Sequence, residues 1–292
     1  MEAAAALERL WPGRGARWVP LSGGITNRNY RVDVDGASFV LRIGGNDTRL
    51  LGIDREIEHA ASLRAAEVGV GPEVIAFVEP EGWLITRFLA APPLTPDELR
   101  RPANIARVAA ALARIHGAAP IPGRFDAYEV VDDYRRVAEG RGATIPAAVA
   151  SLRALAEEIR VARGPQAEVP CHNDLLNANF LDDGEVRIVD WEYAGMGDRF
   201  FDLANLSVNH DFGVAEDRLL LAAYFGAARR ADLAALRLMR FMSDFREAMW
   251  GVVQSAISEL DFDFTGYATE HFDRMFRAAA DPDFEGHLAA LG

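Results

Sequence analysis

The sequence predicts an α+β protein of two lobes, a small lobe of antiparallel strands followed by a larger, mainly helical lobe. Three observations lead to this prediction. Residues 18–43 and 74–88 read as short extended segments joined by turn residues. Beyond residue 104 most of the chain has the apolar spacing of amphipathic helices. The proline-containing stretch 89–94 has the stiffness of a connector, so we expect the lobes to comprise residues 1–90 and 91–292.

The small lobe is expected to hold a sheet whose strands lie at residues 18–21, 30–34, 38–43, 74–78 and 83–88. Asp35-Gly36 is typical of a two-residue hairpin turn between the second and third of these strands. A helix is predicted over residues 53–68, where apolar residues recur at three- and four-residue steps. Residues 1–7 lack the basic region of a signal peptide and read as a further helix.

The large lobe is expected to be built from helices at residues 104–116, 147–163, 200–210, 216–229, 231–258 and 267–280. The segment 120–145 is rich in proline, glycine and charged residues, and we expect it to be a surface loop.

Composition excludes several classes of partner. The 292 residues carry a formal charge of −13, which argues against nucleic acid and anionic membranes and favours a cationic substrate. No apolar run reaches the roughly 20 residues that span a bilayer, so membrane insertion is not expected. A single cysteine, Cys171, excludes an internal disulfide and fits the reducing cytoplasm, where we expect the protein to act. No motif predicts an oligomeric state.

The most informative stretch, residues 171–180, reads H-x-D, four residues, then Asn, and a short hairpin follows it. Phosphoryl transfer from MgATP needs one carboxylate to accept the proton of the attacking hydroxyl. It also needs a carboxamide and a second carboxylate to hold magnesium. Asp174 is therefore the candidate base, and Asn179 and Asp190 are the candidate metal ligands. The turn at 182–184 would fold Asp190 back beside Asn179.

With the runs DWEY at 190–193 and FDLAN at 201–205, this segment resembles the choline/ethanolamine kinase family, within the wider group of aminoglycoside-phosphotransferase-like kinases. The resemblance covers nearly the whole chain. It implies a protein-kinase-like fold, ATP and Mg²⁺ as cofactors, and phosphorylation of the hydroxyl of choline, ethanolamine or a similar small amino alcohol. Two alternatives stay open: a kinase of another small hydroxylated molecule, such as an aminoglycoside or thiamine, and a nucleotide-binding regulator without catalysis.

The loop before the second strand resembles the family's G-G-x-T-N-x-N-Y element. Without that context a Ser-Gly-Gly run is as well explained by an ordinary turn. With it, backbone N–H groups are expected to approach the ATP phosphates. The residues expected at the nucleotide are Ser22, Gly23, Gly24, Thr26 and Asn27.

Arg42 lies near the end of the third strand, where protein kinases place a phosphate-clamping lysine. The chain contains no lysine, so a Walker-type loop is impossible and any phosphate clamp must be an arginine. An arginine can pair with phosphate oxygens through two N–H groups. Glu58 on the following helix is the expected partner of Arg42, with Glu56 as the competitor.

Three further residues near the motif are expected to be structural. His172 would shape the catalytic loop, and Asp202 would either bond the backbone of that loop or cap its own helix. His116 closes a helix before Gly117, and we expect no catalytic role for it.

The helices near the C-terminus carry Trp250-Gly251 followed by Q-x-x-I-S, and later Tyr267-Ala268, which resemble segments of the same family. In that family these aromatics face a quaternary ammonium, which makes no hydrogen bonds. By position, Tyr193, Trp250 and Tyr267 would form the cage, each face contributing about 0.5–2 kcal/mol. The alternative is that they are core aromatics of amphipathic helices.

Glu192 would either place charge near the ammonium or support the magnesium site. Two departures from the family pattern thin the cage. Val253 stands where many eukaryotic members have a second tryptophan, and Leu176 stands where they have a glutamine. A strict preference for choline is therefore not implied.

Overall fold

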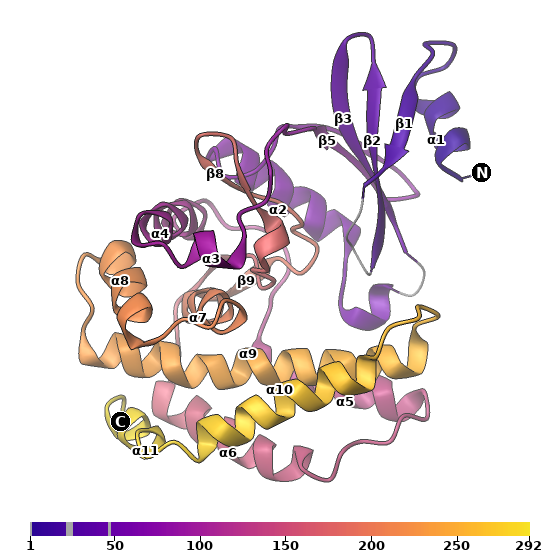
Figure 1. Cartoon of the computed structure of the whole chain (residues 1–292). Coiled ribbons are helices and arrows are strands. Elements are labelled where there is room, and N and C mark those ends of the chain that lie inside the picture. Colours follow the sequence, from indigo (N-terminus) through magenta and orange to yellow (C-terminus); the bar gives the residue numbers. More distant parts are fainter. Residues whose placement is uncertain (1, 22–25, 46–47) are drawn as a thin grey trace.

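A computed structural model describes residues 2–21, 26–45 and 48–292 and shows two lobes (Figure 1). The small lobe contains a five-stranded antiparallel sheet of order β1-β2-β3-β5-β4. Its strands are β1 (Arg17–Pro20), β2 (Asn27–Val34), β3 (Ala37–Gly44), β4 (Val74–Val78) and β5 (Trp83–Arg87). All five predicted strands are present. Asp35 and Gly36 both have positive φ and join the paired residues Val34 and Ala37, which confirms the two-residue turn.

Helix α1 (Glu2–Leu10) packs on this sheet, because Ala6 and Leu7 are buried against Val32 and Leu41. A short 3₁₀ helix, η1 (Thr48–Leu51), precedes α2 (Arg55–Glu67). Helix α2 begins two residues later than predicted, since the Asp54 carboxylate accepts a hydrogen bond from the Glu56 N–H, at 2.9 Å, and so forms the N-cap.

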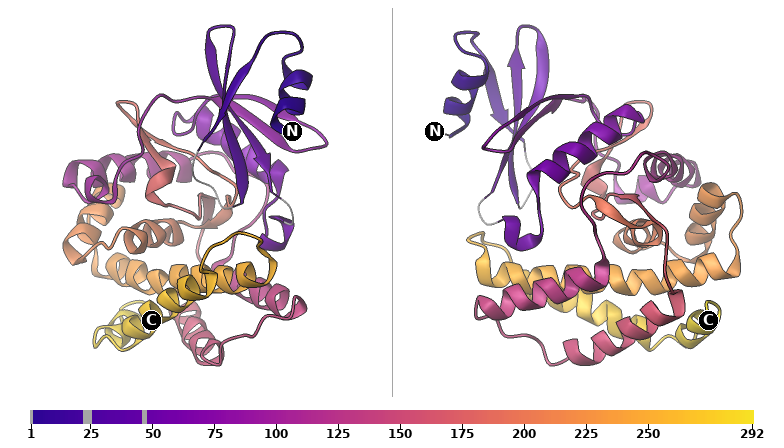
Figure 2. Two further views of the ribbon diagram at one scale, coloured as in Figure 1. Left: turned by 45° about the vertical axis from the view of Figure 1, so that its right-hand side comes forward. Right: turned by 180° about the vertical axis from the view of Figure 1, so that it is seen from behind.

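The large lobe is mainly helical (Figures 1 and 2). Its helices are α3 (Pro96–Leu99), α4 (Pro102–His116), α5 (Ala127–Gly140), α6 (Val149–Arg163), α7 (Arg199–Asn209), α8 (Val214–Phe225), α9 (Arg230–Ile257), α10 (Phe264–Ala279) and α11 (Phe284–Ala289). The 28-residue α9 runs through this lobe. It buries large apolar side chains such as Phe241 and Phe245 in a core shared with α5, α6, α7 and α10.

Helix α5 corrects one prediction, because it occupies residues 127–140 of the segment 120–145, all of which was expected to be a loop. Asp126 caps its first turn by accepting a hydrogen bond from the Tyr128 N–H at 2.9 Å. Val131, Tyr134 and Ala138 recur at three- and four-residue steps and are buried in the core around α9. This apolar stripe was obscured by the charged residues between its members. Helix α11 and the strands β6 and β9 described below were also not predicted.

The predicted catalytic motif, residues 172–190, lies on irregular backbone and short strands between the helices. Strand β6 (Glu168–Cys171) pairs with β9 (Gly195–Asp198), and these two strands bracket η2 (Asn177–Asn179) and the hairpin β7 (Phe180–Asp182)–β8 (Val186–Ile188). The connector 89–94 reaches this hairpin, since the Leu94 N–H donates to the Phe180 carbonyl at 2.7 Å. The motif is thereby held where the two lobes meet.

Candidate active site

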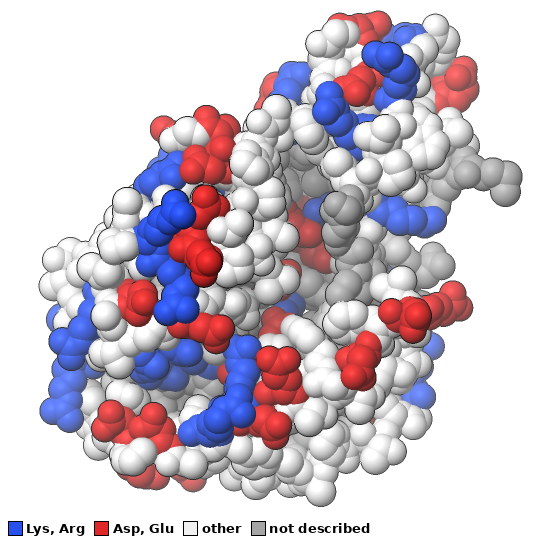
Figure 3. Space-filling view, in the orientation of Figure 1, with Lys and Arg blue, Asp and Glu red and all other residues white. Residues whose placement is uncertain are grey.

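A hollow separates the two lobes, and both acidic and basic side chains are visible in its depth (Figure 3). A cavity of about 430 Å³ occupies this region and is lined by residues of both lobes. Apolar Val40 and Leu84 line it from the sheet, and Leu181 and Val189 line it from the catalytic hairpin. Phe88 and Leu89 line it at the connector, and Arg42, Glu58, Asn179 and Asp190 are among its polar residues. An apolar slot with convergent charged groups at one end matches the two parts of a nucleotide.

His172 shapes the loop that presents Asp174. Its Nε2 lies 2.9 Å from the Val189 carbonyl, and its Nδ1 lies 3.2 Å from the Asp174 N–H. Burial lowers the pKa of His172, so the ring is neutral, donating from Nε2 and accepting at Nδ1. The neighbouring Asn173 has a φ of 68°, a left-handed conformation that is uncommon for a residue other than glycine. The predicted loop-shaping role of His172 is confirmed by these contacts.

Asp202 on α7 holds the same loop from the other side. Its carboxylate accepts hydrogen bonds from the backbone N–H groups of His172, at 2.8 Å, and Asn173, at 2.7 Å. His116 Nε2 lies 3.0 Å from the same carboxylate, and its Nδ1 lies 2.7 Å from the Tyr224 hydroxyl. The expected backbone bonding by Asp202 is therefore present. His116 was predicted only to close its helix. Its contact with Asp202 also connects α4 to the residues that support the loop.

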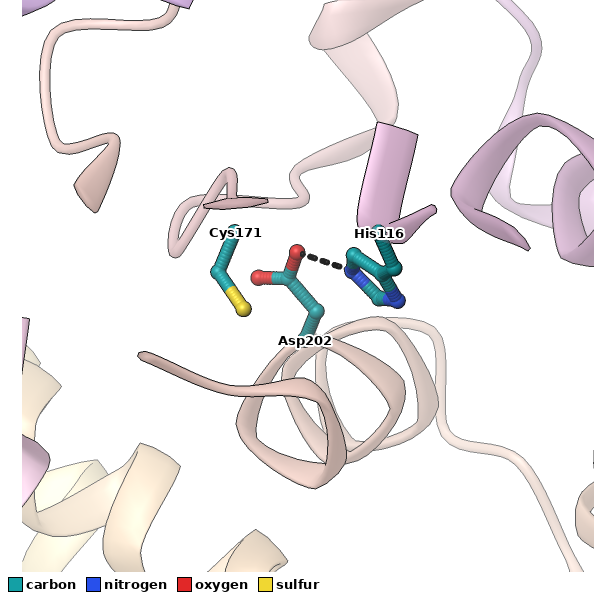
Figure 4. A group of neighbouring side chains, drawn as sticks. All are labelled: His116, Cys171 and Asp202. Atoms are coloured by element: carbon teal, nitrogen blue, oxygen red, sulfur yellow. Dashed lines mark hydrogen bonds and ion pairs between the residues drawn. The ribbon is translucent and has the colours of Figure 1, made fainter. Parts of the chain in front are cut away.

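Cys171 lies beside Asp202 and His116, so that a thiol, a carboxylate and an imidazole are gathered in one buried group (Figure 4). Burial raises the pKa of the Cys171 thiol well above its usual range, and a neutral thiol is a poor metal ligand. The Asp202 oxygens are already bonded to the loop backbone and to His116. This group is therefore part of the support of the catalytic loop.

Asn179 and Asp190 both line the cavity between the lobes, at the two ends of the hairpin. The Val189 N–H donates to the Asn179 carbonyl at 3.0 Å, and the Asn179 side-chain N–H donates to the Asp174 carbonyl at 2.8 Å. None of the described hydrogen bonds uses the side-chain oxygen of Asn179, so this oxygen can serve as a ligand. Asp190 has a φ of 69° and lines the same cavity. An amide oxygen and a carboxylate are the oxygen ligands that Mg²⁺ prefers, so this pair fits that ion.

Arg42 links the sheet to the metal-ligand candidate. Its Nη1 forms an ion pair with the Asp190 carboxylate at 2.7 Å and a second one with Glu58. Burial alone would lower the pKa of Arg42, but the surrounding carboxylates raise it above its usual value, so the guanidinium is charged. Glu56 is exposed on the same helix. The structure therefore selects Glu58 over Glu56 as the partner of Arg42.

Glu192 is bonded to the small lobe. It accepts hydrogen bonds from the Thr26 hydroxyl and from the Asn27 side-chain amide, the latter at 2.8 Å. Burial raises the pKa of Glu192 to about 7, and Asp190 contributes to the same shift. The side chains of Thr26 and Asn27, expected at the phosphates, are thus directed to a carboxylate of the other lobe. Ser22, Gly23 and Gly24, from the same loop, lie outside the described residues.

The three predicted cage aromatics do come together. The Trp250 indole N–H donates to the Tyr193 hydroxyl at 3.0 Å, and the rings of Trp250 and Tyr267 meet edge to face with centroids 5.6 Å apart. All three pack with the core around α9. One face of Tyr193 is already covered, because the guanidinium carbon of Arg246 lies 4.2 Å from its ring centre.

Arg246 and Glu247 are site residues that the sequence reasoning missed. The two buried side chains form an ion pair, and Arg246 Nη1 lies 3.6 Å from the Asp174 carboxylate. The Tyr267 hydroxyl donates to the other Glu247 oxygen at 2.8 Å. Burial raises the pKa of Asp174 to about 8, although Arg246 acts in the opposite direction. The sequence did offer a signal for these two residues, because Arg246 and Glu247 are adjacent charged residues within the apolar run that leads to Trp250.

A second cavity, of about 330 Å³, opens beside Tyr193. It lies between η1, the start of α2 and α5, and it is lined in part by Leu51, Asp133, Tyr134 and Glu192. Glu192 and Tyr193 both line this second cavity. Among the described residues, no helix is both long and apolar enough to cross a bilayer.

Comparison with known proteins identifies relatives of this arrangement. The sequence profile of the phosphotransferase enzyme family (APH) matches residues 17–239. A solved choline/ethanolamine kinase family protein from Mesorhizobium loti is 35% identical, with a TM-score of 0.86 over 99% of this chain and 98% of that one. Ethanolamine kinase 2 of Homo sapiens is 28% identical over an alignment 305 residues long, and this alignment covers 91% of this chain and 77% of that enzyme. The choline kinase LicA from Streptococcus pneumoniae is 23% identical and shares the fold, with a TM-score of 0.78 over 96% of this chain and 98% of that one.

Proposed function

The chain belongs to the phosphotransferase enzyme family and, within it, to the choline/ethanolamine kinase family, and we propose that it transfers the γ-phosphoryl group of MgATP to the hydroxyl of a small amino alcohol. The observation that carries this proposal is the placement of Asp174. Its backbone carbonyl accepts a hydrogen bond from the Asn179 side chain at 2.8 Å, and its carboxylate lies 3.6 Å from Arg246. Arg246 in turn is paired with Glu247 and covers the Tyr193 ring, which links Asp174 to the aromatic and acidic group.

The cavity between the lobes is proposed to bind ATP. Val40 and Leu84 above and Leu181 and Val189 below would hold the adenine ring, with the connector at its edge. Arg42 would bind phosphate oxygens. Both of its described ion pairs use Nη1, so its remaining N–H groups are available to a ligand. The loop at Ser22, Gly23 and Gly24 is proposed to cover the phosphates, as in the related sequences.

Asn179 and Asp190 are proposed to hold Mg²⁺. When bound, the ion would neutralise negative charge on the phosphates. The local charge is consistent with this role. The ion pairs around Asp190 join three carboxyl groups to only two guanidinium groups, so a bound cation would not meet an excess of positive charge. In the reaction, the protein would hold the acceptor hydroxyl at Asp174. The Asp174 carboxylate would take the hydroxyl proton as the phosphoryl group is transferred.

The proposed acceptor is choline, ethanolamine or a similar small cationic amino alcohol. Glu247 is buried and ionised, since neighbouring Arg246 lowers its pKa, and it lies one helical turn before Trp250. A carboxylate and aromatic edges suit an ammonium group. Because Arg246 already covers one face of Tyr193, Trp250 and Tyr267 would provide the remaining aromatic contacts. We place the reaction in the cytoplasm, where MgATP is present and Cys171 stays reduced.

ADP release in the presence of a panel of acceptors tests the proposal. We expect choline or ethanolamine to stimulate ADP release with equal formation of the phosphomonoester. Stimulation by an aminoglycoside or by thiamine, with none by the amino alcohols, would replace the proposed acceptor class. ADP release that no acceptor stimulates, by folded protein that binds MgATP, would contradict the proposal.

A further inference from the structure

Arg55, at the start of α2, contacts both lobes and was not among the predicted site residues. We propose that Arg55 is a positioning residue, which holds the start of β2 and the Arg42–Glu58 pair in place against Glu192 and thereby sets the affinity for the nucleotide. The inference rests on the proposed function, because it assumes that the cavity between the lobes binds ATP.

The contacts of Arg55 are directed to three different segments. Its Nη1 forms an ion pair with Glu58 at 2.6 Å and a longer one with Glu192 at 3.3 Å. Its Nη2 donates to the Asn27 side-chain oxygen at 2.8 Å, and the Asn27 amide in turn donates to Glu192 at 2.8 Å. The side chain of Arg55 is 16% exposed, whereas those of Glu58 and Glu192 are 2% and 4% exposed.

These contacts close a ring of charges across the cleft. From Asp190 the ion pairs run to Arg42, from Arg42 to Glu58, from Glu58 to Arg55, and from Arg55 to Glu192. Glu192 follows Asp190 by two residues, so the backbone completes the ring. A shift of α2 or β3 relative to the catalytic hairpin would break at least one pair and leave a buried charge without its partner, which is costly. The ring therefore opposes separation of the lobes at the phosphate end of the cavity.

The chain also leaves space for the Arg55 guanidinium. A methyl group built on Gly44, at the end of β3, would lie 2.9 Å from both Nε and Nη2 of Arg55. Any larger residue at position 44 would displace that guanidinium from Asn27 and Glu192. Gly44 thus offers a second way to disturb the ring without removing a charge.

The alternative is that Arg55 only stabilises the fold, as buried ion pairs can when one partner is removed. Nucleotide affinity separates the two roles. The test compares Arg55→Gln with wild type. The control is Arg64→Gln, which removes an arginine that is paired with Glu67 on the same helix. The affinity for MgATP would be measured by calorimetry without any acceptor, and KM and kcat by ADP release.

We expect Arg55→Gln to weaken MgATP binding by about ten- to a hundredfold, with a KM for the acceptor within about twofold of wild type. Arg64→Gln should leave both values unchanged. Arg55→Lys, which keeps the charge but cannot bridge several partners at once, should give an intermediate affinity. Gly44→Ala should also weaken MgATP binding, and it carries the test if Arg55→Gln does not fold.

A lower melting temperature of Arg55→Gln with unchanged MgATP affinity would overturn the inference and leave the proposed function intact. Equal losses in Arg64→Gln and Arg55→Gln would also overturn it. Wild-type protein that does not bind MgATP would instead contradict the proposed function, and with it this inference.

Discussion

The guanidinium of Arg246 lies 3.6 Å from the carboxylate of Asp174, and the same nitrogen is paired with Glu247. One buried cation thus serves two carboxylates, one in the catalytic loop and one on α9. This arrangement joins the proposed base to the proposed acceptor pocket. It also means that the ionisation of Asp174 depends on a residue 72 positions later in the chain.

The first prediction concerns the base. Asp174→Asn keeps the shape of the side chain but removes its ability to accept a proton. We expect kcat to fall by about 10²- to 10⁴-fold, because general-base catalysis contributes factors of that size. MgATP affinity, measured by calorimetry, should stay within a few fold of wild type. Turnover near the wild-type value in correctly folded Asp174→Asn protein would show that another group takes the proton.

The second prediction concerns magnesium. Asp190→Asn weakens the only carboxylate of the proposed metal pair, and it also removes one ion-pair partner of Arg42. We expect lower activity and a higher Mg²⁺ concentration for half-maximal rate, measured by titrating Mg²⁺ at fixed ATP. As a control, Asp183→Asn changes an exposed carboxylate in the nearby hairpin turn and should leave the titration unchanged. A wild-type Mg²⁺ titration in Asp190→Asn would exclude Asp190 as a ligand.

The third prediction concerns the acceptor. Trp250→Ala removes the largest aromatic face beside Glu247. We expect KM for choline to rise two- to thirtyfold, equivalent to about 0.5–2 kcal/mol, and KM for ATP to change little. Ethanolamine should be affected less, because its ammonium can still donate hydrogen bonds to Glu247. Trp18→Ala, at the far edge of the sheet, is the control. Equal losses for the two acceptors, or none, would assign Trp250 to the core.

The fourth prediction concerns pH. The base must be ionised, and burial raises the pKa of Asp174 to about 8 in the free protein, so kcat/KM should rise with pH up to that region. Arg246 lowers this pKa, so Arg246→Gln should move the rise to higher pH. Arg237→Gln, an arginine of the same helix that pairs with Asp217, is the control. A shift to lower pH, or no shift, in the Arg246→Gln profile would contradict the role given to Arg246.

The fifth prediction concerns the support of the catalytic loop. Asp202→Ala leaves the N–H groups of His172 and Asn173, and the ring of His116, without their shared acceptor. We expect the free energy of unfolding to fall by about 3 kcal/mol or more, since each unsatisfied buried polar group costs about 1–3 kcal/mol. Chemical denaturation measures this change, with Asp273→Ala on the exposed side of α10 as the control. A loss below about 1 kcal/mol would mean that the loop holds its shape without Asp202.

Several features were predictable because they are local in the chain. The Asp35-Gly36 turn follows from residues that accept positive φ, and the pairing of Val34 with Ala37 follows from that turn. In the same way, the short hairpin after Asn179 returns the chain so that Val189 bonds to Asn179 and the next residue, Asp190, lines the same cavity as Asn179. Helix α5 was missed although its signal was also local, because charge and nearby proline and glycine concealed the buried stripe of Val131, Tyr134 and Ala138.

By itself, the sequence determined the two-lobed α+β fold and the strands of the sheet, and it located the residues that are proposed for phosphoryl transfer, because each depends on periodicity, turn chemistry or close spacing. Only the tertiary structure decided which ionisable side chains meet: Arg55 with Glu192, Arg246 with Asp174, and His116 with Asp202. Members of each pair lie at least 72 positions apart in the chain. No local rule links them, since an arginine on an amphipathic helix is usually solvated and its partner is chosen by how the elements pack.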